Sequence, residues 1–379
     1  MAVRVIIVGG GIVGTSIAYH LTKNGCEVVI VDEHAPIGIG SSFTFACINY
    51  FSFVEEPYFS FRRKAINFSV TLAEEVRAAN HVHLSGTLRW GDTGSTRETI
   101  QYFASRLQRM GVAVEYWTPG DVQRRLEPNL RLGEVEGPII RLTEEGWIDS
   151  IPFIGRLRQA AIDTGLLAVV TATALHIDTR RDEVCVTTSA GNLHGTFVCL
   201  AAGSGTSTLT KALGCKIDVA KDPGILFTAS IQPSILNHVV YAGDLHFRPD
   251  SNGRVMGGHH TASFDGTDGD ALTQSLRLAA ELAKVVPSIS QAPDIQAYAV
   301  SRPVPVDGLP IAGWLPEMER IYVSACHSGI TIGPLLGMLC ANEILGKSSA
   351  LPTEFRTSRF KPDVKTHTLR STEDGPEAG

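Results

Sequence analysis

Three glycines near the N-terminus, Gly9, Gly11 and Gly14, follow the spacing G-x-G-x-x-G. In this spacing the first glycine permits a tight turn, the second lets a pyrophosphate approach the backbone, and the third lets a helix and a strand pack closely. Asp32 stands 18 residues beyond Gly14, where its carboxylate could accept hydrogen bonds from both hydroxyls of an adenosine ribose. These residues predict a dinucleotide site, and this motif alone leaves both FAD and NAD open.

The elements around the glycines are the ones that such a site needs. Residues 3–8 are almost wholly apolar and β-branched, which is typical of a strand buried on both faces. A helix is expected over 15–24, and its N-terminus would present N–H groups and a positive dipole end to the phosphates. A second buried strand, 28–31, leads into Asp32. Strand, turn, helix and strand together form a complete βαβ unit.

The rest of the chain gives a coarser pattern. Apolar spacing and turn residues predict helices over 57–80, 97–111, 147–165 and 272–286, strands over 86–90, 168–177, 183–188 and 196–200, and a hairpin turn at 249–254.

Three further motifs follow one another toward the C-terminus. They are Ser301-Arg302-Pro303, residues 307–313 (DGLPIAG) and residues 325–334 (ACHSGITIGP). Together with the N-terminal loop and Ala201-Ala202-Gly203-Ser204, they resemble the D-amino-acid oxidase (DAO) superfamily of FAD-dependent oxidoreductases. That superfamily includes glycine and sarcosine oxidases, D-amino-acid dehydrogenase, and opine and hydroxyproline oxidoreductases. The resemblance covers residues 1 to about 360.

The resemblance implies an α/β fold, α+β overall. A Rossmann-like FAD-binding domain would be assembled from separated stretches, with an inserted mixed or antiparallel β-sheet domain for the substrate. We expect the cofactor domain to comprise 1–50, 146–215 and 296–360, the substrate domain 51–145 and 216–295, and a disordered tail 361–379.

The resemblance also implies where FAD would be held. The loop 329–333 would direct backbone amides at the pyrimidine end of the flavin, with Pro334 opening a helix that runs to Leu345. The alternative is a glycine-rich loop that only caps a structural helix. Val300 stands where some relatives attach flavin to a cysteine, so we expect noncovalent FAD. The expected cofactor residues are Gly9, Gly11, Ile12, Val13, Gly14, Asp32, Glu33, Ser41, Ser42, Ala202, Gly203, Arg302, Gly329, Ile330 and Thr331.

Arg302 is the main candidate for substrate binding. Relatives use the corresponding arginine to hold a substrate carboxylate, and a guanidinium can donate two parallel hydrogen bonds to that group. The alternative is an arginine that bridges domains structurally. His246 and Arg248 lie two apart on a predicted strand and so face one side. The candidate catalytic residues are Arg302, His246, Arg248, His259 and His327. His246, His259, His260 and His327 lack the spacing of metal ligands, and a structural role is the alternative for each.

The implied reaction is oxidation of the C–N bond of a small amino acid or N-substituted amino acid. A hydride would pass to flavin N5, and the imine would then hydrolyse. Thr331 and Val255 stand where the sarcosine oxidase branch has lysines, which favours a dehydrogenase that passes electrons to a quinone or a partner subunit. One alternative is the flavin subunit of a hetero-oligomeric opine or hydroxyproline dehydrogenase. Another is an NAD(P)H-dependent flavin monooxygenase.

Composition narrows the class of protein. The 379 residues suggest two domains, with 44% hydrophobic and 19% charged residues. A net charge of −6 disfavours binding to nucleic acids and to anionic membrane surfaces. Seven scattered cysteines without C-x-x-C fit neither a disulfide framework nor a thiolate metal site. Because no signal peptide or transmembrane stretch is evident, a cytoplasmic location is expected.

Overall fold

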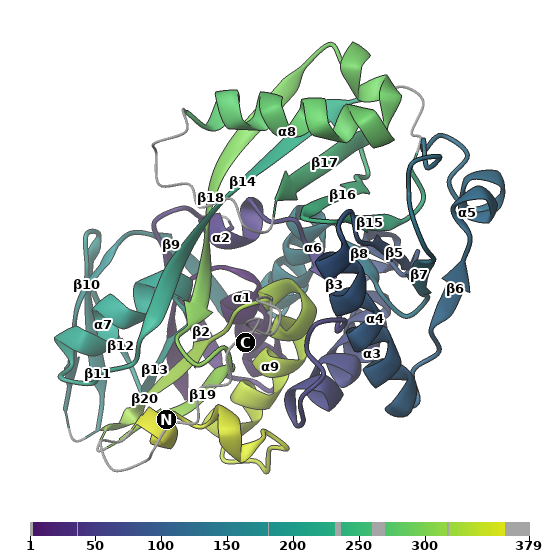
Figure 1. Ribbon diagram of the computed structural model, residues 1–379. Coiled ribbons are helices and arrows are strands. Elements are labelled where there is room, and N and C mark those ends of the chain that lie inside the picture. The colour runs from purple at the N-terminus through teal and green to yellow at the C-terminus, as the bar shows by residue number, and fades with distance from the viewer. Residues whose placement is uncertain are drawn as a thin grey trace.

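The computed structural model describes residues 3–360 apart from 36, 181, 232–235, 260–269 and 317 (Figure 1). The predicted tail, 361–379, and His260 lie outside these residues.

A six-stranded sheet forms the lower part of the molecule in Figure 1. Neighbouring strands pair in parallel except β19, which is antiparallel to β20. In spatial order the strands are β19 (Ile311–Leu315), β20 (Met318–Ala325), β13 (Phe197–Leu200), β1 (Arg4–Val8), β2 (Glu27–Asp32) and β9 (Leu167–Thr171). Three stretches that are far apart in sequence therefore build one sheet.

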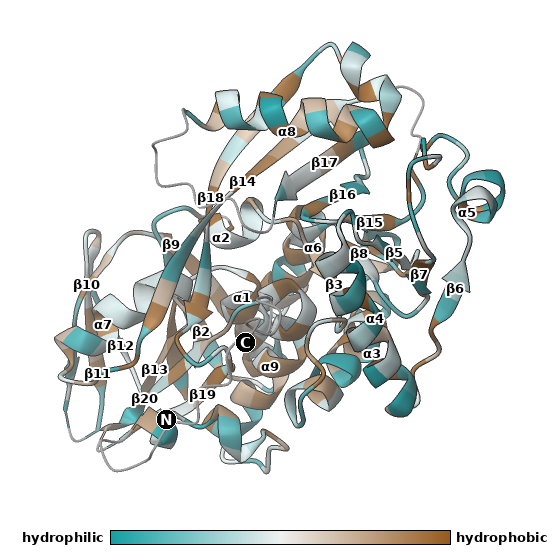
Figure 2. Ribbon diagram, viewed as in Figure 1, coloured by the Kyte–Doolittle hydropathy of each residue, from teal (hydrophilic) through white to brown (hydrophobic). Residues whose placement is uncertain are grey.

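Both faces of this sheet are covered, which explains why its strands are apolar throughout. On one face Val5 and Ile7 pack against α1 (Ile12–Lys23) and α9 (Gly329–Ile344), while α6 (Ser150–Ile162) and α3 (Tyr58–Glu75) lie beyond them. On the other face Ile6 and Val8 pack against a three-stranded sheet. Its strands are β10 (Ala174–Thr179), β11 (Val184–Thr188) and β12 (Gly191–Gly195), next to α7 (Thr206–Ala212). Figure 2 shows hydrophobic residues along α9 at the centre of these layers.

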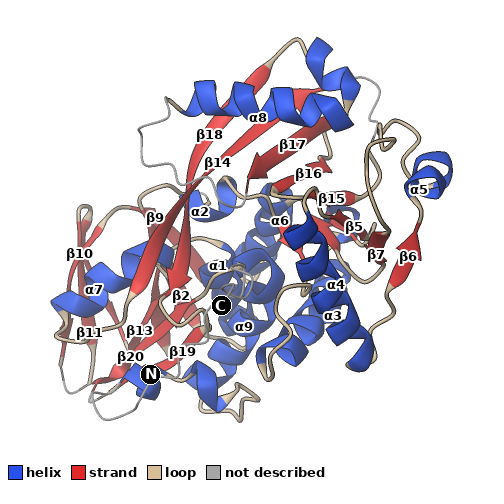
Figure 3. Ribbon diagram, in the orientation of Figure 1, coloured by secondary structure: helices blue, strands red, loops and turns tan. Residues whose placement is uncertain are grey.

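The second large sheet has eight strands and carries α8 (Ala271–Val285) on its outer face (Figure 3). Every pair is antiparallel except β5 with β15, so the sheet is mixed. In spatial order the strands are β18 (Ile295–Pro305), β14 (Val219–Ser230), β17 (Arg254–His259), β16 (Leu245–Pro249), β15 (Val239–Ala242), β5 (Thr87–Trp90), β7 (Ile139–Leu142) and β6 (Glu115–Trp117).

Short elements join the two large sheets. A small sheet contains β3 (Cys47–Ile48), β8 (Gly146–Ile148) and β4 (Val82–His83). The remaining helices are α2 (Ile39–Ser42), α4 (Gly94–Arg109) and α5 (Pro119–Arg125), and the 3-10 helices are η1 (Ala79–His81), η2 (Gly203–Gly205), η3 (Pro287–Gln291), η4 (Thr353–Phe355) and η5 (Thr357–Phe360). Within the described part of the chain, no helix combines the length and the apolar character that a membrane crossing requires.

The fold agrees with the predicted class, a Rossmann-like body with an inserted mixed sheet. The exact domain limits stay a prediction, and β18 pairs only within the larger sheet although 296–305 was assigned to the cofactor domain.

Two predicted elements were wrong. The single helix over 147–165 is instead a strand followed by a helix, because Trp147 pairs with Cys47 across the small sheet and stacks on His83. The single strand over 168–177 is two strands, β9 and β10, in different sheets. The partners of β8 and β9 come from remote parts of the chain, whereas β10 pairs with the next strand, β11.

Candidate active site

The predicted glycine loop joins β1 to α1. Gly9 has φ of +112°, and a Cβ atom there would lie 2.2 Å from the carbonyl oxygen of Ala201. A Cβ atom at Gly14 would lie 2.0 Å from the carbonyl oxygen of Gly9. Only glycine therefore fits these two positions. Gly11, the N-cap residue of α1, has no side chain that could cap the helix. The N–H groups at the start of the helix can therefore bind an anion.

Two of the predicted cofactor side chains, Asp32 and Ser41, contact the loop. Asp32 accepts hydrogen bonds from the backbone N–H of Gly10 (2.6 Å, Oδ2) and of His34 (2.7 Å, Oδ1). Because each carboxylate oxygen can accept a second bond, Asp32 can still receive a ribose diol. Ser41 Oγ accepts from Ile12 N at 3.0 Å.

Two other predicted cofactor residues point elsewhere. Glu33 is exposed and accepts a hydrogen bond from Thr173. The hydroxyl of Ser42 lies within 3.3 Å of the carbonyl oxygens of Ile37 and Gly38. Their part in cofactor binding stays a prediction.

Arg158, on α6, is a residue of this site that the sequence pattern does not reveal. Its side chain is buried, with 6% exposed, and its Nη2 donates to Gly10 O (2.8 Å) and Thr15 Oγ1 (3.1 Å). Its Nε and Nη1 have no hydrogen-bond partner. Burial lowers the pKa of Arg158, and the charge of Asp32 opposes that effect. A buried cation with unused donors beside a glycine loop fits a site for a phosphate-bearing ligand.

The C-terminal glycine motif lies beside the N-terminal one. Ser16 Oγ donates to Pro334 O at 2.9 Å, and a Cβ atom at Gly333 would lie 3.2 Å from Ile12. Thr331 Oγ1 donates to Cys47 O at 3.1 Å. The two glycine motifs, which are more than 300 residues apart, therefore converge on one edge of the sheet, as the family resemblance implied.

The helix at this motif begins earlier than predicted. The sequence placed its start at Pro334, but α9 begins at Gly329 and contains Pro334. Pro334 lacks the N–H that would donate to the carbonyl of Ile330, so the helix loses that hydrogen bond near its start. Residue Ser328 adopts a left-handed conformation and provides no side-chain cap. The amides of Gly329, Ile330 and Thr331 thus belong to the first turn of α9.

Arg302 lies on β18 and forms an ion pair with Asp222, its register partner on β14. About a third of the Arg302 side chain is exposed, and its Nε is a buried donor without a partner. A Cβ atom at Gly203 would lie 3.8 Å from Pro303, so this part of β18 is next to the loop after β13. The guanidinium keeps donors for an anion.

His246 and Arg248 share one face of β16. The ring of His246 lies edge-on to Phe45, with centroids 4.4 Å apart, and its Nε2 would be 2.7 Å from a Cβ atom at Gly258. Arg248 is buried, donates to Phe45 O and lies 4.5 Å from the ring of Trp147. Burial lowers the pKa of Arg248 to about 10, so it remains charged at neutral pH. Arg248 thus lines the site, and its contacts with Phe45 and Trp147 hold it in place.

The remaining candidates are placed as follows. His259 Nε2 is 4.0 Å from Asp244, and His327 Nδ1 is 3.0 Å from Ser328 Oγ, just before α9. Two strands separate Arg302 from His246, and the registers place Tyr298 rather than Arg302 opposite His246. The structure thus groups His246 with Arg248 but leaves Arg302 on a distant strand of the same sheet.

Val255 does not lie on the face of the sheet that carries His246 and Arg248. Its side chain belongs to the apolar core under α8, whereas Met256 contacts Arg248 on the opposite face of β17. The absence of a lysine at position 255 is therefore not evidence for a dehydrogenase. That step of the prediction was wrong, because the Val255 side chain is in the apolar core. Met256 lies on the face that carries His246 and Arg248, and its side chain carries no charge either.

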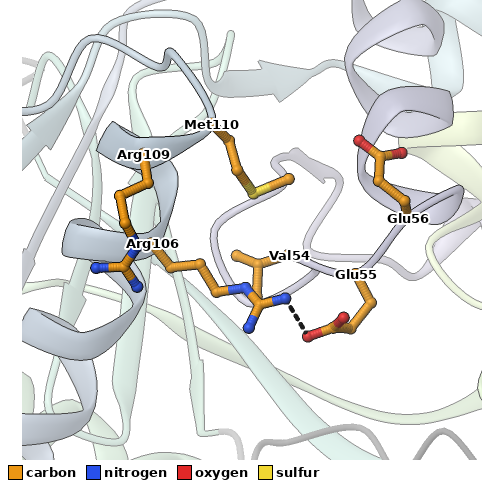
Figure 4. Close-up of a pocket in the computed structure, with 6 residues that line it drawn as sticks. All are labelled: Val54, Glu55, Glu56, Arg106, Arg109 and Met110. Carbon is orange, nitrogen blue, oxygen red and sulfur yellow. Dashed lines mark ion pairs between the residues drawn. The ribbon is translucent and has the colours of Figure 1, made fainter.

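A separate surface cavity of about 450 Å³ lies between α4 and the start of α3 (Figure 4). Arg106 and Glu55, which line it, form an ion pair of 2.7 Å. None of the predicted site residues lines this cavity, and we assign it no role in the chemistry.

Two glycine loops lie at helix N-termini that converge at one edge of the mostly parallel sheet, and the carboxylate of Asp32 lies beside the first loop. These features define a dinucleotide-binding enzyme of the Rossmann type. The sequence model of the FAD dependent oxidoreductase family (DAO) matches residues 4–343. The chain belongs to this family and is an FAD-dependent oxidoreductase.

Known proteins support this placement. The chain is 25% identical to a glycine oxidase of Bacillus licheniformis, over 90% of this chain and 92% of that protein. The structure of glycine oxidase from Geobacillus kaustophilus has a TM-score of 0.85 at 22% identity, covering 96% of this chain and 100% of the other. The structure of L-proline dehydrogenase from P. horikoshii has a TM-score of 0.81 at 20% identity, with 95% and 98% covered. The predicted family and cofactor are confirmed.

Proposed function

We propose that this enzyme oxidises the C–N bond of a small amino acid or N-substituted amino acid. The observation that carries the proposal is Arg302, whose buried Nε has no partner and which lies next to the Gly203 loop. A guanidinium with free donors suits a substrate carboxylate. The names of the similar proteins, glycine oxidase and L-proline dehydrogenase, point to the same class of substrate.

In this proposal one group of residues would bind FAD and another would bind the substrate. The glycine loop, Asp32 and Arg158 would hold the adenosine diphosphate part without a covalent bond. Bound FAD would accept a hydride, which carries both electrons of the oxidation, from the substrate carbon, and the resulting imine would hydrolyse in water. Arg302 would orient the carboxylate, and such positioning supplies much of the rate in this type of transfer. No general base is required once the amine is neutral.

We further propose that the electron acceptor is not oxygen but a quinone or a partner subunit. The side chain of Thr331 is hydrogen-bonded to Cys47 O, and Met256 lies against Arg248 on β17. Neither position supplies a cation to stabilise the negative charge that forms when oxygen takes an electron. Slow reoxidation by oxygen is therefore expected.

The test is anaerobic reduction of the purified holoenzyme. Glycine, sarcosine, D-amino acids, prolines and opines are added one at a time, and at least one should bleach the flavin absorption. Arg302→Leu should then require about ten- to a hundredfold more substrate for half-reduction, the effect of losing a charged hydrogen bond. If no compound of the panel bleaches the flavin, the proposal fails. Admitting oxygen or a soluble quinone to the bleached sample identifies the acceptor, and rapid recovery in oxygen alone would contradict the dehydrogenase assignment.

A further inference from the structure

Arg62, on α3, is a fully buried cation whose partners are all neutral. Its Nε and Nη2 donate to the backbone O and to Oδ1 of Asn49, both at 2.8 Å, and its Nη1 donates to Tyr58 Oη at 3.1 Å. The guanidinium lies 3.8 Å from the ring centroid of Phe53. Each nitrogen of the Arg62 guanidinium thus has a hydrogen-bond partner, but the charge is not balanced by these groups.

The nearby carboxylates are already paired with other arginines. Glu145 forms a buried ion pair with Arg89 (3.0 Å), and Glu144 pairs with Arg63 (2.8 Å). In the part of the chain that the structure describes, no carboxylate lies within ion-pair distance of Arg62. A buried charge without a counter-charge is expensive. Such a cost is offset when a ligand brings the missing negative charge.

Short contacts connect Arg62 to the start of α9. Asn49 Nδ2 donates to Cys47 Sγ at 3.2 Å, and the backbone oxygen of Cys47 accepts from Thr331 Oγ1 at 3.1 Å. Burial raises the pKa of Cys326 to about 12, and the charge of Arg62 opposes this rise. The same opposing effect acts on Cys47. The charge of Arg62 therefore acts on two residues close to the start of α9, in space for Cys47 and in sequence for Cys326.

The order of the strands shows which part of FAD would meet this field. Asp32 at the end of β2 suits the adenosine ribose, and the loop after β1 suits the pyrophosphate. Continuing in the same direction along the sheet, β13 and β20 come next, and α9 follows β20. The isoalloxazine ring would thus lie by the uncapped first turn of α9. Two electrons and one proton leave reduced flavin with one negative charge, near N1 and O2.

We propose that Arg62 is a positioning residue that acts through Asn49 and the start of α9 to stabilise the negative charge of reduced FAD. The inference rests on the flavin placement used in the proposed function. It makes Arg62 a determinant of the reduction potential, with no contact to the substrate. A higher potential favours electron uptake from the substrate and weakens the drive to reduce oxygen.

The experiment replaces Arg62 in the FAD-loaded enzyme and measures two properties that need no substrate. The first is the two-electron reduction potential. The second is the dissociation constant of sulfite, whose sulfur adds to flavin N5 while the displaced electron pair becomes negative charge at N1 and O2. Arg62→Met should weaken sulfite binding about tenfold and lower the potential by the equivalent of about 30 mV. Arg62→Lys keeps the charge and should restore both values to within about twofold.

Two further variants make the result decisive. Arg63→Met removes the adjacent, Glu144-paired arginine of the same helix and should change neither property. If Arg62→Met fails to fold, Asn49→Asp tests the proposal in its place. It puts a carboxylate against Arg62, so it should weaken sulfite binding and lower the reduction potential, as Arg62→Met is expected to do. Unchanged potential and sulfite binding in folded, FAD-loaded variants would overturn the proposal. Since neither readout uses an amino acid, that outcome is distinct from failure of the bleaching test.

Discussion

At the scale of single residues, the ion pair of Arg302 with Asp222 would compete with the proposed binding of a substrate carboxylate to Arg302. The pair neutralises the arginine, yet both side chains are a third or more exposed. Exposed ion pairs contribute little, roughly 0.2–1 kcal/mol, so a substrate carboxylate can displace Asp222. We therefore expect Asp222 to disfavour ligands that carry only a carboxylate and to tolerate ligands that also carry an amine.

Replacing Asp222 should therefore change the binding of a plain carboxylate. Asp222→Asn is expected to tighten acetate binding about two- to fivefold, because Arg302 then faces the anion without competition. The measurement is a titration of the flavin absorption spectrum with acetate. Asp218→Asn, which removes a carboxylate paired with Lys216 just before β14, serves as the matched control and should leave the constant unchanged. Equal acetate affinity in all three proteins would show that Asp222 does not compete for Arg302.

The residues predicted from sequence are those with a local signature. Gly9, Gly14 and Asp32 could be found because their roles depend on spacing along one βαβ unit. Asp222 could not, since its proximity to Arg302 depends on the register of two strands far apart in sequence. The buried Arg62 and the half-buried Arg63 are neighbours in one helix. Their tertiary partners distinguish them, because Arg62 contacts Asn49 whereas Arg63 pairs with Glu144.

At the scale of elements, the close packing of α1 and α9 brings the two glycine motifs together. The βαβ unit was predicted to within three residues, because its apolar periodicity is local. The start of α9 was predicted five residues late, because a proline usually marks the first turn of a helix. What keeps Gly329–Gly333 helical is contact with α1, which a local pattern does not contain.

Two helical glycines give a matched test of this packing. A Cβ atom at Gly337 of α9 would lie 2.5 Å from Ser16 of α1, whereas Gly155 of α6 has no atom within 4 Å of that position. Gly337→Ala should destabilise the protein by about 1–3 kcal/mol through overpacking. It should also weaken FAD binding, since α9 must move. Gly155→Ala should be neutral or stabilising by up to about 1 kcal/mol, because alanine favours the helix.

Chemical unfolding monitored by circular dichroism, together with FAD titration of each apoprotein, measures both effects. Equal stability of the two variants would mean that α1 and α9 can separate slightly without cost, and that their contact does not fix the flavin end of the site.

At the scale of the whole molecule, the acid stability of the fold depends in part on a histidine buried between layers. His20, on α1, packs against Tyr19 and Phe68, and burial lowers its pKa from 6.5 to about 4. The nearby Glu75 raises that pKa and Lys23 lowers it further. In the unfolded chain the imidazole takes up a proton near pH 6.5, but in the folded protein it does so only near pH 4. The folded state therefore loses stability as the pH falls through this window.

From pH 7 to pH 5 this histidine should remove about 2 kcal/mol from the free energy of unfolding. His20→Gln cannot take up the proton, so its unfolding free energy should fall by about 2 kcal/mol less over the same interval. His34→Gln, at an exposed histidine, should retain the full wild-type dependence.

Urea unfolding at the two pH values, with the same excess of FAD throughout, compares the three proteins. Because any change in FAD affinity with pH is common to all of them, the difference between variants isolates His20. Parallel curves for His20→Gln and the wild type would place the acid sensitivity of this fold in other groups, foremost Glu75, whose pKa is lowered by its contacts with Lys23 and Tyr19 against the opposing effect of burial.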